Sequence, residues 1–363
     1  MRRIRLTARL CRARAPRLTW RKRYPGAAGD DARMHSWDFP SGARDAAGPV
    51  ARVVYVSRAT ITHSPYQEME RIRACAVRHN MPAGVATALL YQCGWFLQWK
   101  EGPGDAVQRI MDRVAADPRH AQQVVLHASS GPRLLAGPWS MAIVQCGEPP
   151  ERMEQRVQAL RSAAVLGRQL APAAVWRCFS TPVRHHGKSG DDASFQRLLV
   201  CAAAGTDSFT LVQWLARRYG EELVHRRFAG ADTPDVAADC VDIPFGDTVL
   251  RASAMARNGL RLPLTRAFVS DYEQAVLLLS GDEFCDGELV RRLAQACAGL
   301  VAPTVLAVAA DPEWHRPARG LARRHGLAYV EVQANPSDPA ECWQVLAPLL
   351  ERWREAPATR RLA

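Results

Sequence analysis

The order of strand-like and helix-like segments between residues 51 and 146 constrains the fold of this chain most. The strand-like runs are 51–57, 84–91, 95–99, 122–128 and 139–146. An amphipathic helix with Pro65 in its first turn follows the first run, and a second begins at Gly104-Asp105 and ends before Asp117-Pro118. Each half of this order is a strand, a helix and a strand. The order therefore predicts a ferredoxin-like α+β sheet with βαββαββ connectivity.

Several side chains in this region stand on or beside apolar runs without fitting a simple hydrophobic core. They are Tyr55, His79, Asn80, Gln98, Asp117, Arg119, His120, Trp139 and Met141. A Tyr and a Gln on neighbouring strands, facing an Asn at a helix end, can hydrogen-bond a flat heterocycle. They do so without bringing a charge into a pocket of low dielectric constant.

In order and spacing, these residues resemble the BLUF domain, the family that senses blue light with FAD, over about residues 50–146. The resemblance implies that the flavin lies between the two helices and one face of the sheet. It implies that Tyr55 is the photoactive tyrosine, that Gln98 in F-L-Q-W-K-E-G is the switching glutamine, and that Asn80 holds the C4 carbonyl and N3. The other implied residues are His79, Asp117, Arg119 and His120 for cofactor binding, and Trp139 and Met141 for signal relay.

The resemblance also implies a mechanism. Tyr55 gives an electron and then a proton to the light-excited flavin, and Gln98 rotates or tautomerises before the charges recombine. A new hydrogen bond near O4 then shifts the absorption slightly to the red, and the fifth strand carries the change to a remote region.

Three short segments depart from the family pattern. Val85-Ala86-Thr87 stands where Ile-Thr-Gly is usual, Lys100-Glu101-Gly102 replaces Leu-Glu-Gly, and Leu134-Leu135 replaces the usual Phe after an Arg. Tyr55, Asn80 and Gln98 are unaffected. A flavin-free domain of the same fold, acting as an interaction adaptor, stays open as an alternative.

The second half of the chain alternates apolar strand-like runs with helical runs, which predicts a doubly wound α/β domain with a parallel sheet. The strand-like runs are 197–203, 248–255, 274–280, 303–309 and 327–332, and the helical runs are near 209–219, 286–299, 315–325 and 338–353. The order resembles a degenerate small-GTPase-like domain. Ala203, Ser208 and Phe209 stand where the phosphate-binding loop has Gly, Gly and Lys, and only Asp311 remains of N-K-x-D.

We therefore expect the chain to be a blue-light photoreceptor and not an enzyme, with a non-catalytic interaction domain as its output. The alternative is an enzyme in which light gates a nucleotide-binding domain. The expected partner is a protein of unknown identity that binds the C-terminal domain.

The expected domain boundaries follow from these patterns. They are a disordered basic extension at 1–48, the flavin domain at 49–147, a connector and linker at 148–192, the output domain at 193–355, and a tail at 356–363. Within the connector, 151–169 predicts an amphipathic helix that relays the signal, and pairing with a second copy of itself stays open. His185-His186 in the polar linker is expected to be solvated, and no metal site is expected.

Charge and cysteine content bound the remaining function classes. The formal net charge is +12, but residues 1–33 hold eleven Arg or Lys against two Asp, which leaves +3 for the rest. Nucleic-acid binding would thus rest on this arm alone, and we do not expect it. A disordered tail, a true start at Met34, and a nucleic-acid or membrane-surface arm stay open for it. No apolar run is long enough for a membrane span, and the ten cysteines form no C-x-x-C pair, so we expect a cytoplasmic protein with free thiols.

Overall fold

A computed structural model describes the chain from Pro49 to Glu355 with several gaps. The described ranges are 49–62, 64–135, 137, 139–145, 149–166, 170–180, 195–230 and 236–355. The expected N-terminal extension, the polar linker with His185-His186, and the C-terminal tail lie outside these ranges. All described residues belong to one unit by their internal contacts.

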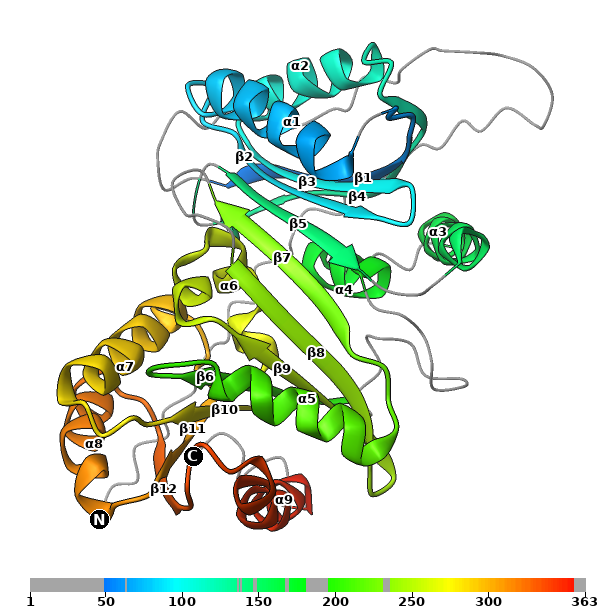
Figure 1. Cartoon of the computed structure of the whole chain (residues 1–363). Helices are drawn as coiled ribbons and strands as arrows, with labels where there is room; N and C mark the ends of the chain where they lie inside the picture. The colour runs from blue at the N-terminus through cyan, green and yellow to red at the C-terminus, as the bar shows by residue number, and fades with distance from the viewer. Residues whose placement is uncertain are drawn as a thin grey trace, which may run out of the picture. The chain divides into compact units, whose positions relative to one another are not determined.

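The N-terminal half forms five strands and two helices in the expected order (Figure 1). They are β1 (Val50–Ala59), α1 (Pro65–Asn80), β2 (Ala86–Gln92), β3 (Trp95–Gly102), α2 (Gly104–Ala115), β4 (His120–Gly131) and β5 (Trp139–Gln145). The strands β4, β1, β3 and β2 are neighbours in this order and antiparallel, and β5 adds parallel to β2. With α1 and α2 over one face of the sheet, this is the ferredoxin-like arrangement that the sequence predicted.

Local sequence explains the register of the central strands. The hairpin between β2 and β3 turns on Cys93 and Gly94, which both have positive φ angles, 46° and 78°. A two-residue loop of this kind fixes which residues face each other across the hairpin. Because side chains alternate along a strand, Phe96, Gln98 and Lys100 share one face of β3.

Two further helices cover the opposite face of this sheet. They are α3 (Pro150–Val165) and α4 (Pro172–Ser180). Met153 and Val157 of α3 and Trp176 of α4 are buried in the same apolar cluster as Leu97 and Trp99 of β3. The sequence predicted α3 but not α4. The apolar side of α3 is thus part of the core of this chain.

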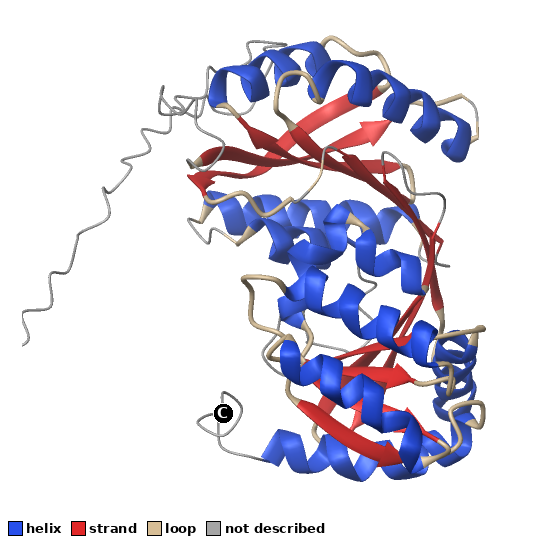
Figure 2. Ribbon diagram, turned by 90° about the vertical axis from the view of Figure 1, so that its left-hand side faces the viewer, coloured by secondary structure: helices blue, strands red, loops and turns tan. Residues whose placement is uncertain are grey.

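The C-terminal half is a mixed sheet with helices on both faces (Figure 2). Its strands are β6 (Phe195–Ala202), β7 (Val224–Gly230), β8 (Val236–Phe245), β9 (Thr248–Met255), β10 (Gln274–Leu278), β11 (Thr304–Ala309) and β12 (Tyr329–Gln333). Its α-helices are α5 (Asp207–Tyr219), α6 (Pro263–Phe268), α7 (Glu283–Cys297), α8 (His315–Arg324) and α9 (Pro339–Glu355). Short 3-10 turns occupy Arg257–Arg261, Val269–Asp271 and Pro312–Trp314.

Five strands of this half, β12, β11, β10, β6 and β9, run parallel, and α5 and α9 pack on one face while α7 and α8 pack on the other. The five strands that the sequence predicted are parallel as expected, but the sheet also contains β7 and β8, which are antiparallel and were not predicted. Both strands escaped the sequence pattern for a physical reason. Arg226 and Arg227 interrupt β7, and Asp239, Asp242 and Pro244 interrupt β8, whereas the apolar runs of parallel strands are continuous.

Strand β7 also joins the two halves. It pairs antiparallel with β5 from Ser140↔Gly230 to Gln145↔His225, so all strands of the described residues form one twelve-stranded sheet. The sequence had suggested two separate sheets with a connector between them.

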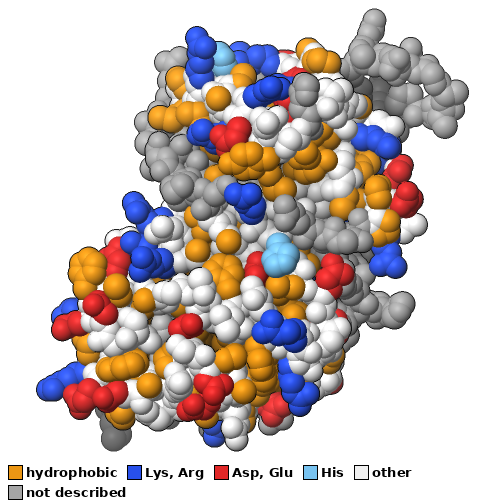
Figure 3. Space-filling model, viewed as in Figure 1, with side chains coloured by type: hydrophobic (Ala, Val, Ile, Leu, Met, Phe, Trp, Pro, Cys, Tyr) orange, Lys and Arg blue, Asp and Glu red, His pale blue; other side chains and the backbone are white. Residues whose placement is uncertain are grey.

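The surface shows no gathering of one charge on the face drawn in Figure 3, where basic and acidic side chains of the described residues are interspersed. Among the described residues, no helix is long and apolar enough to cross a membrane.

Candidate functional site

The site begins with two side chains that face each other on adjacent strands. Tyr55 of β1 lies opposite Gln98 of β3 in the antiparallel register, and its ring packs in one apolar cluster with residues of α2. Tyr55 is fully buried and Gln98 is 3% exposed. The Tyr55 hydroxyl has no hydrogen-bond partner among the described residues. Burial, with a smaller contribution from Asp117, raises the pKa of Tyr55 well above its usual value, so the phenol is neutral.

Cross-strand neighbours extend this pair toward β5. Gln98 lies opposite Leu89 of β2, and Leu89 lies beside Met141 of β5. Met141 is 2% exposed and packs in one apolar cluster with Leu89 and Trp139. The indole Nε1 of Trp139 is buried and, within the described part of the chain, also lacks a partner.

The end of α1 brings one of its two predicted residues to the sheet. Asn80 is buried, and its Nδ2 donates to Thr87 Oγ1 of β2 at 3.2 Å. Its backbone carbonyl accepts from the amides of Ala83 and Val85, which fixes the turn into β2. His79, one residue earlier, is exposed. The structure therefore places Asn80 beside the sheet and His79 at the surface, where a role in holding the flavin stays a prediction.

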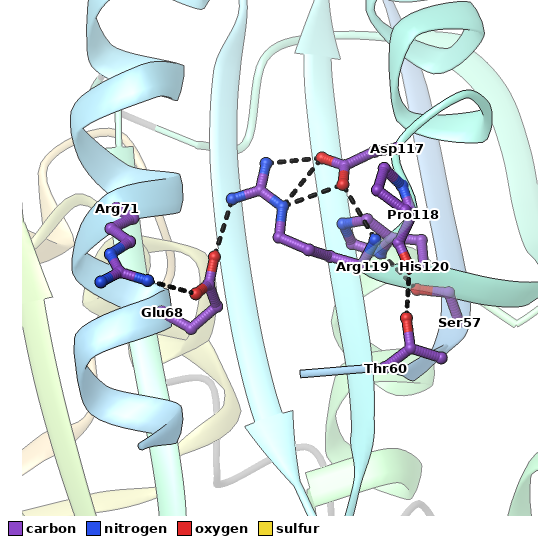
Figure 4. A network of polar contacts seen from close by, with 8 residues as sticks. All are labelled: Ser57, Thr60, Glu68, Arg71, Asp117, Pro118, Arg119 and His120. Carbon is purple, nitrogen blue, oxygen red and sulfur yellow. Dashed lines mark hydrogen bonds and ion pairs between the residues drawn. The ribbon is translucent and has the colours of Figure 1, made fainter. Parts of the chain in front are cut away.

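The turn after α2 holds an ion-pair network around Arg119 (Figure 4). Arg119 Nη2 lies 2.5 Å from Asp117 Oδ2, and Nη1 lies 2.9 Å from Glu68 Oε1 of α1. Hydrogen bonds from Arg119 are the largest cause that lowers the pKa of both carboxyl groups. The same pairs raise the pKa of the arginine. Arg119 and Asp117 thus tie the turn to α1.

His120, the next residue, turns inward from the same loop. Its Nδ1 and Ser57 Oγ are hydrogen-bonded at 2.7 Å, and its ring packs 5.0 Å from the ring of Phe96. Burial lowers the pKa of His120 to about 4, so the imidazole is neutral at pH 7. Figure 4 shows Ser57 of β1 and Thr60, just after that strand, reaching this loop, where Thr60 donates to the Pro118 carbonyl.

Sequence reasoning missed four residues that shape the site. Glu68 closes the Arg119 network, Ser57 orients His120, and Lys100 lies buried on the same face as Gln98. Glu101 is buried on the other face, where its carboxylate accepts from Trp99 Nε1 at 3.0 Å and from the amides that precede β5. The signals in the sequence that could have pointed to three of them are an acid in the first turn of α1 and a Lys-Glu pair within an apolar strand.

The residues present fit a flavin. Tyr55, Gln98 and Asn80 offer neutral hydrogen-bonding groups on one buried sheet face, and the Tyr55 hydroxyl lacks a partner within the described part of the chain. The charged side chains at the nearby turn are paired with each other. Apart from Lys100, which lies on the same face, this lining consists of neutral or paired groups and suits a flat, uncharged heterocycle.

Comparison with known proteins agrees with this geometry. Residues 50–142 match the family described as sensors of blue light using FAD. Among curated proteins, the photoactivated adenylate cyclase subunit beta-like protein FB of Euglena gracilis is 30% identical over 136 residues, which cover 35% of this chain and 16% of that protein. The photoactivated adenylate cyclase subunit beta of Euglena longa is 35% identical over 75 residues, 21% of this chain and 9% of that protein.

The chain therefore spans less than a fifth of these relatives. Among solved structures, the dark state of the BLUF protein BlrB is 21% identical, with 36% of this chain and 90% of that chain covered and a TM-score of 0.25. A bacterial light-regulated adenylyl cyclase is 14% identical over 69% of this chain and 68% of that one, with a TM-score of 0.27. These TM-scores are too low to carry weight.

The relatives correct one expectation from the sequence. We expected the chain not to be an enzyme, and that expectation is wrong, because the curated relatives are subunits of photoactivated adenylate cyclases. The degenerate phosphate-binding loop was a poor guide, because its missing residues argue only against nucleotide binding of the small-GTPase kind. They say nothing about other enzyme activities. A light-regulated activity belongs among the functions to be tested.

Proposed function

Residues 50–142 form a BLUF domain, a blue-light sensor, and we propose that the chain is a photoreceptor in which FAD bound to this domain controls the α/β part built on β6 to β12. One observation carries the proposal. Tyr55 and Gln98 lie opposite each other on a buried sheet face, and the Tyr55 hydroxyl has no partner among the described residues.

The side chains of the site support a hydrogen-bond switch. A bound flavin would supply the absorption of blue light and an acceptor for one electron. Tyr55 would donate the electron and then its phenolic proton, Gln98 on the facing strand would re-form its hydrogen bonds, and the electron and the proton would then return to Tyr55. Asn80, whose Nδ2 donates to Thr87 Oγ1, would hold the edge of the ring from the end of α1. His120 is neutral and Arg119 is paired with Asp117 and Glu68, so neither leaves an unbalanced charge beside Tyr55.

A continuous row of cross-strand neighbours offers a route out of the site. It runs from Gln98 through Leu89 and Met141 to Ala229 of β7. Met141 and Ala229 are both buried and pack in the same apolar cluster. We infer that a change at Gln98 reaches the C-terminal half through β5 and β7, because packed strands pass on small shifts with little loss. This route needs no part of the connector helix.

An absorption spectrum tests the proposal directly. Purified full-length protein is recorded in the dark, after blue light, and during recovery. We expect a structured flavin band that moves slightly to the red and returns thermally. Protein that stays colourless after addition of FAD, or flavin that only bleaches, would show the proposal to be wrong.

Hydrogen exchange of backbone amides tests the route through β7. In light we expect altered exchange in Val224–Gly230, because these residues pair with β5. Met141→Ala should keep the spectral shift but reduce this light effect. Val144→Ala is the matched control, because Val144 is a buried residue of β5 on the opposite face. Equal effects of both variants would rule out the row as the route.

A second candidate function is a light-regulated enzyme, favoured by the names of the curated relatives. The full chain is incubated with ATP and a divalent cation in darkness and in blue light, and cyclic AMP is measured. Formation that rises in light would establish this activity. A rate equal to the protein-free blank in both conditions would exclude it.

A further inference from the structure

Lys100 occupies an unusual place on the sheet face that carries the switch. It stands two residues after Gln98 on β3, so both side chains point to the same face. Its cross-strand neighbours are Val53 of β1 and Thr87 of β2, the residue that accepts from Asn80. Lys100 is 2% exposed, and its Nζ lies 5.8 Å from the centroid of the Tyr55 ring.

No acidic side chain of the described residues balances this buried cation. None of their carboxylates forms an ion pair with Lys100, and the charge that acts on it most is another cation, Arg113 of α2. Two other buried charges are partnered. Glu101 accepts three hydrogen bonds, and Arg251 is paired with Asp242 at 2.5 Å.

A cation on a side chain that is only 2% exposed is costly, because it loses most of its hydration without gaining an ion-pair partner among the described residues. The face of the Tyr55 ring offsets part of this cost by a cation–π contact. Leucine is the residue that the family pattern has at this position, so packing alone does not require a lysine. The ammonium is thus in a position to serve a group that brings acceptor atoms to this face.

Resting on the proposed function, we propose that Lys100 is a further binding residue of the flavin site, whose ammonium donates a hydrogen bond to an acceptor atom of the ring and favours negative charge there. It would then raise both the affinity for the flavin and the reduction potential of the bound flavin. Tyr55 and Gln98 remain the residues of the switch itself.

The pKa values of the surrounding groups allow the protonation of Lys100 to be followed by varying the pH. Burial, and Arg113 to a smaller extent, lower the pKa of Lys100 to about 7. The pKa of His120 on β4 lies at about 4, and that of Tyr55 on β1 is raised well above 10. The remaining charged groups are Glu68 and Asp117, whose pKa values are lowered, Arg119, whose pKa is raised, and Arg113. Among these facing groups, Lys100 is the one that titrates near neutral pH.

The sign of the effect follows from linkage. If the protonated form binds the ring better, binding raises the pKa of Lys100, and affinity is highest below the pKa of the free protein. Affinity then falls as pH rises from about 7 toward the pKa of the complex. The slope is up to about tenfold in Kd per pH unit.

The test measures FAD binding to flavin-free full-length protein by fluorescence quenching from pH 6 to pH 9, and the midpoint potential of the bound flavin. We compare the wild type with Lys100→Met, which keeps the length of the side chain without its charge. Arg109→Met is the control, because it removes a positive charge from an exposed residue of α2 that is paired with Asp105. At pH 6 we expect the Kd of Lys100→Met for FAD to be about tenfold higher than that of the wild type, because a charged hydrogen bond is lost. From pH 6 to pH 9 the Kd of this variant should not change. Its potential should be more negative than that of the wild type.

The outcomes separate this inference from the proposed function. A wild type that binds FAD and shifts in light, with a Lys100→Met variant of equal affinity, pH dependence and potential, would overturn the inference alone. FAD binding by Lys100→Met but not by the wild type would mean that the lysine excludes the ring, and would overturn it as well. Absence of FAD binding in both would overturn the inference together with the proposed function. Unchanged binding by Arg109→Met and a pH-dependent Kd confined to proteins with Lys100 would establish it.

Discussion

Two buried polar groups in the two halves of the sheet have opposite surroundings. In the first turn of α7, Asp286 is 1% exposed, and its carboxylate accepts from Ser280 N at 2.8 Å, Ser280 Oγ at 2.9 Å and Gly281 N at 3.1 Å in the turn after β10. On β1, the hydroxyl of Tyr55 is equally buried and accepts from or donates to none of the described residues. Depth of burial is the same, and the number of partners differs.

The difference separates structural roles from functional ones. A buried polar group with all its partners fixes a turn, and Asp286 fixes the one that starts α7. A buried polar group without partners costs the folded state about 1–3 kcal/mol and persists where a ligand or a reaction makes use of it. The same contrast holds between the paired Arg251 and Lys100, which has no ion-pair partner among the described residues.

The largest expected effect is the loss of the light response when Tyr55, the buried group without partners among the described residues, or Gln98 opposite it is replaced. We expect Tyr55→Phe and Gln98→Leu each to abolish the red shift completely while leaving bound flavin in place. Each change removes a hydrogen-bonding group and nearly conserves side-chain volume, so the fold should persist. Light-minus-dark absorption spectra measure the shift, and the flavin-to-protein absorbance ratio is the control. A normal shift in either variant would contradict the assignment of the switch.

Replacement of Asp286, the buried group with partners, should lower the free energy of unfolding and leave the light response unchanged. We expect Asp286→Ala to lower the free energy of unfolding by about 3 kcal/mol, because three donors lose their acceptor inside the fold. Asp282→Ala is the matched control. Its carboxylate caps the same helix by accepting from Cys285 N at 2.7 Å at the surface, and its loss should lower the free energy of unfolding less than the loss of Asp286 does. Urea unfolding of both variants measures the difference. Equal losses would mean that burial does not distinguish the two acids.

Much of the fold could be predicted from the sequence where hydrophobic period and turn chemistry coincide. The order from β1 to β5, the helix start at Pro65 and the hairpin at Gly94 followed from such patterns. Strands β7 and β8 could not be predicted in this way. Their charged residues and Pro244 conceal the alternation, and pairing between β5 and β7 is decided by contacts between residues 80 to 90 positions apart in the sequence.

The site divides in a similar way. The positions of Tyr55, Asn80 and Gln98 could be predicted because the family resemblance supplies their spacing. The pairing of Arg119 with Glu68 could not, since Glu68 lies 51 residues away on a different element. Lys100 was visible as a departure from the family pattern, but its burial and the lack of an ion-pair partner among the described residues are properties of the packed sheet.

The smallest expected effect concerns the charged groups that do have partners beside the switch. Arg119 is about a third exposed, so its ion pairs with Asp117 and Glu68 should contribute only about 1 kcal/mol at pH 7. Both acids have lowered pKa values in the folded protein. Their contribution is therefore complete above the pKa of the unfolded chain, about 4, and is lost as pH falls through the lower folded values.

Arg119→Met should accordingly reduce stability at pH 7 by about 1 kcal/mol and raise the pH at which acid unfolding begins. The difference from the wild type should shrink as pH falls from about 5 to about 3, because the acids become protonated in both proteins. Far-UV circular dichroism with urea at each pH measures it. Arg73→Met, which breaks a surface pair with Glu70 on the same helix as Glu68, is the control and should have a smaller effect. A difference that stays constant with pH would mean that Arg119 acts through the packing of its aliphatic stem, and the turn would then owe its position to contact area and not to charge.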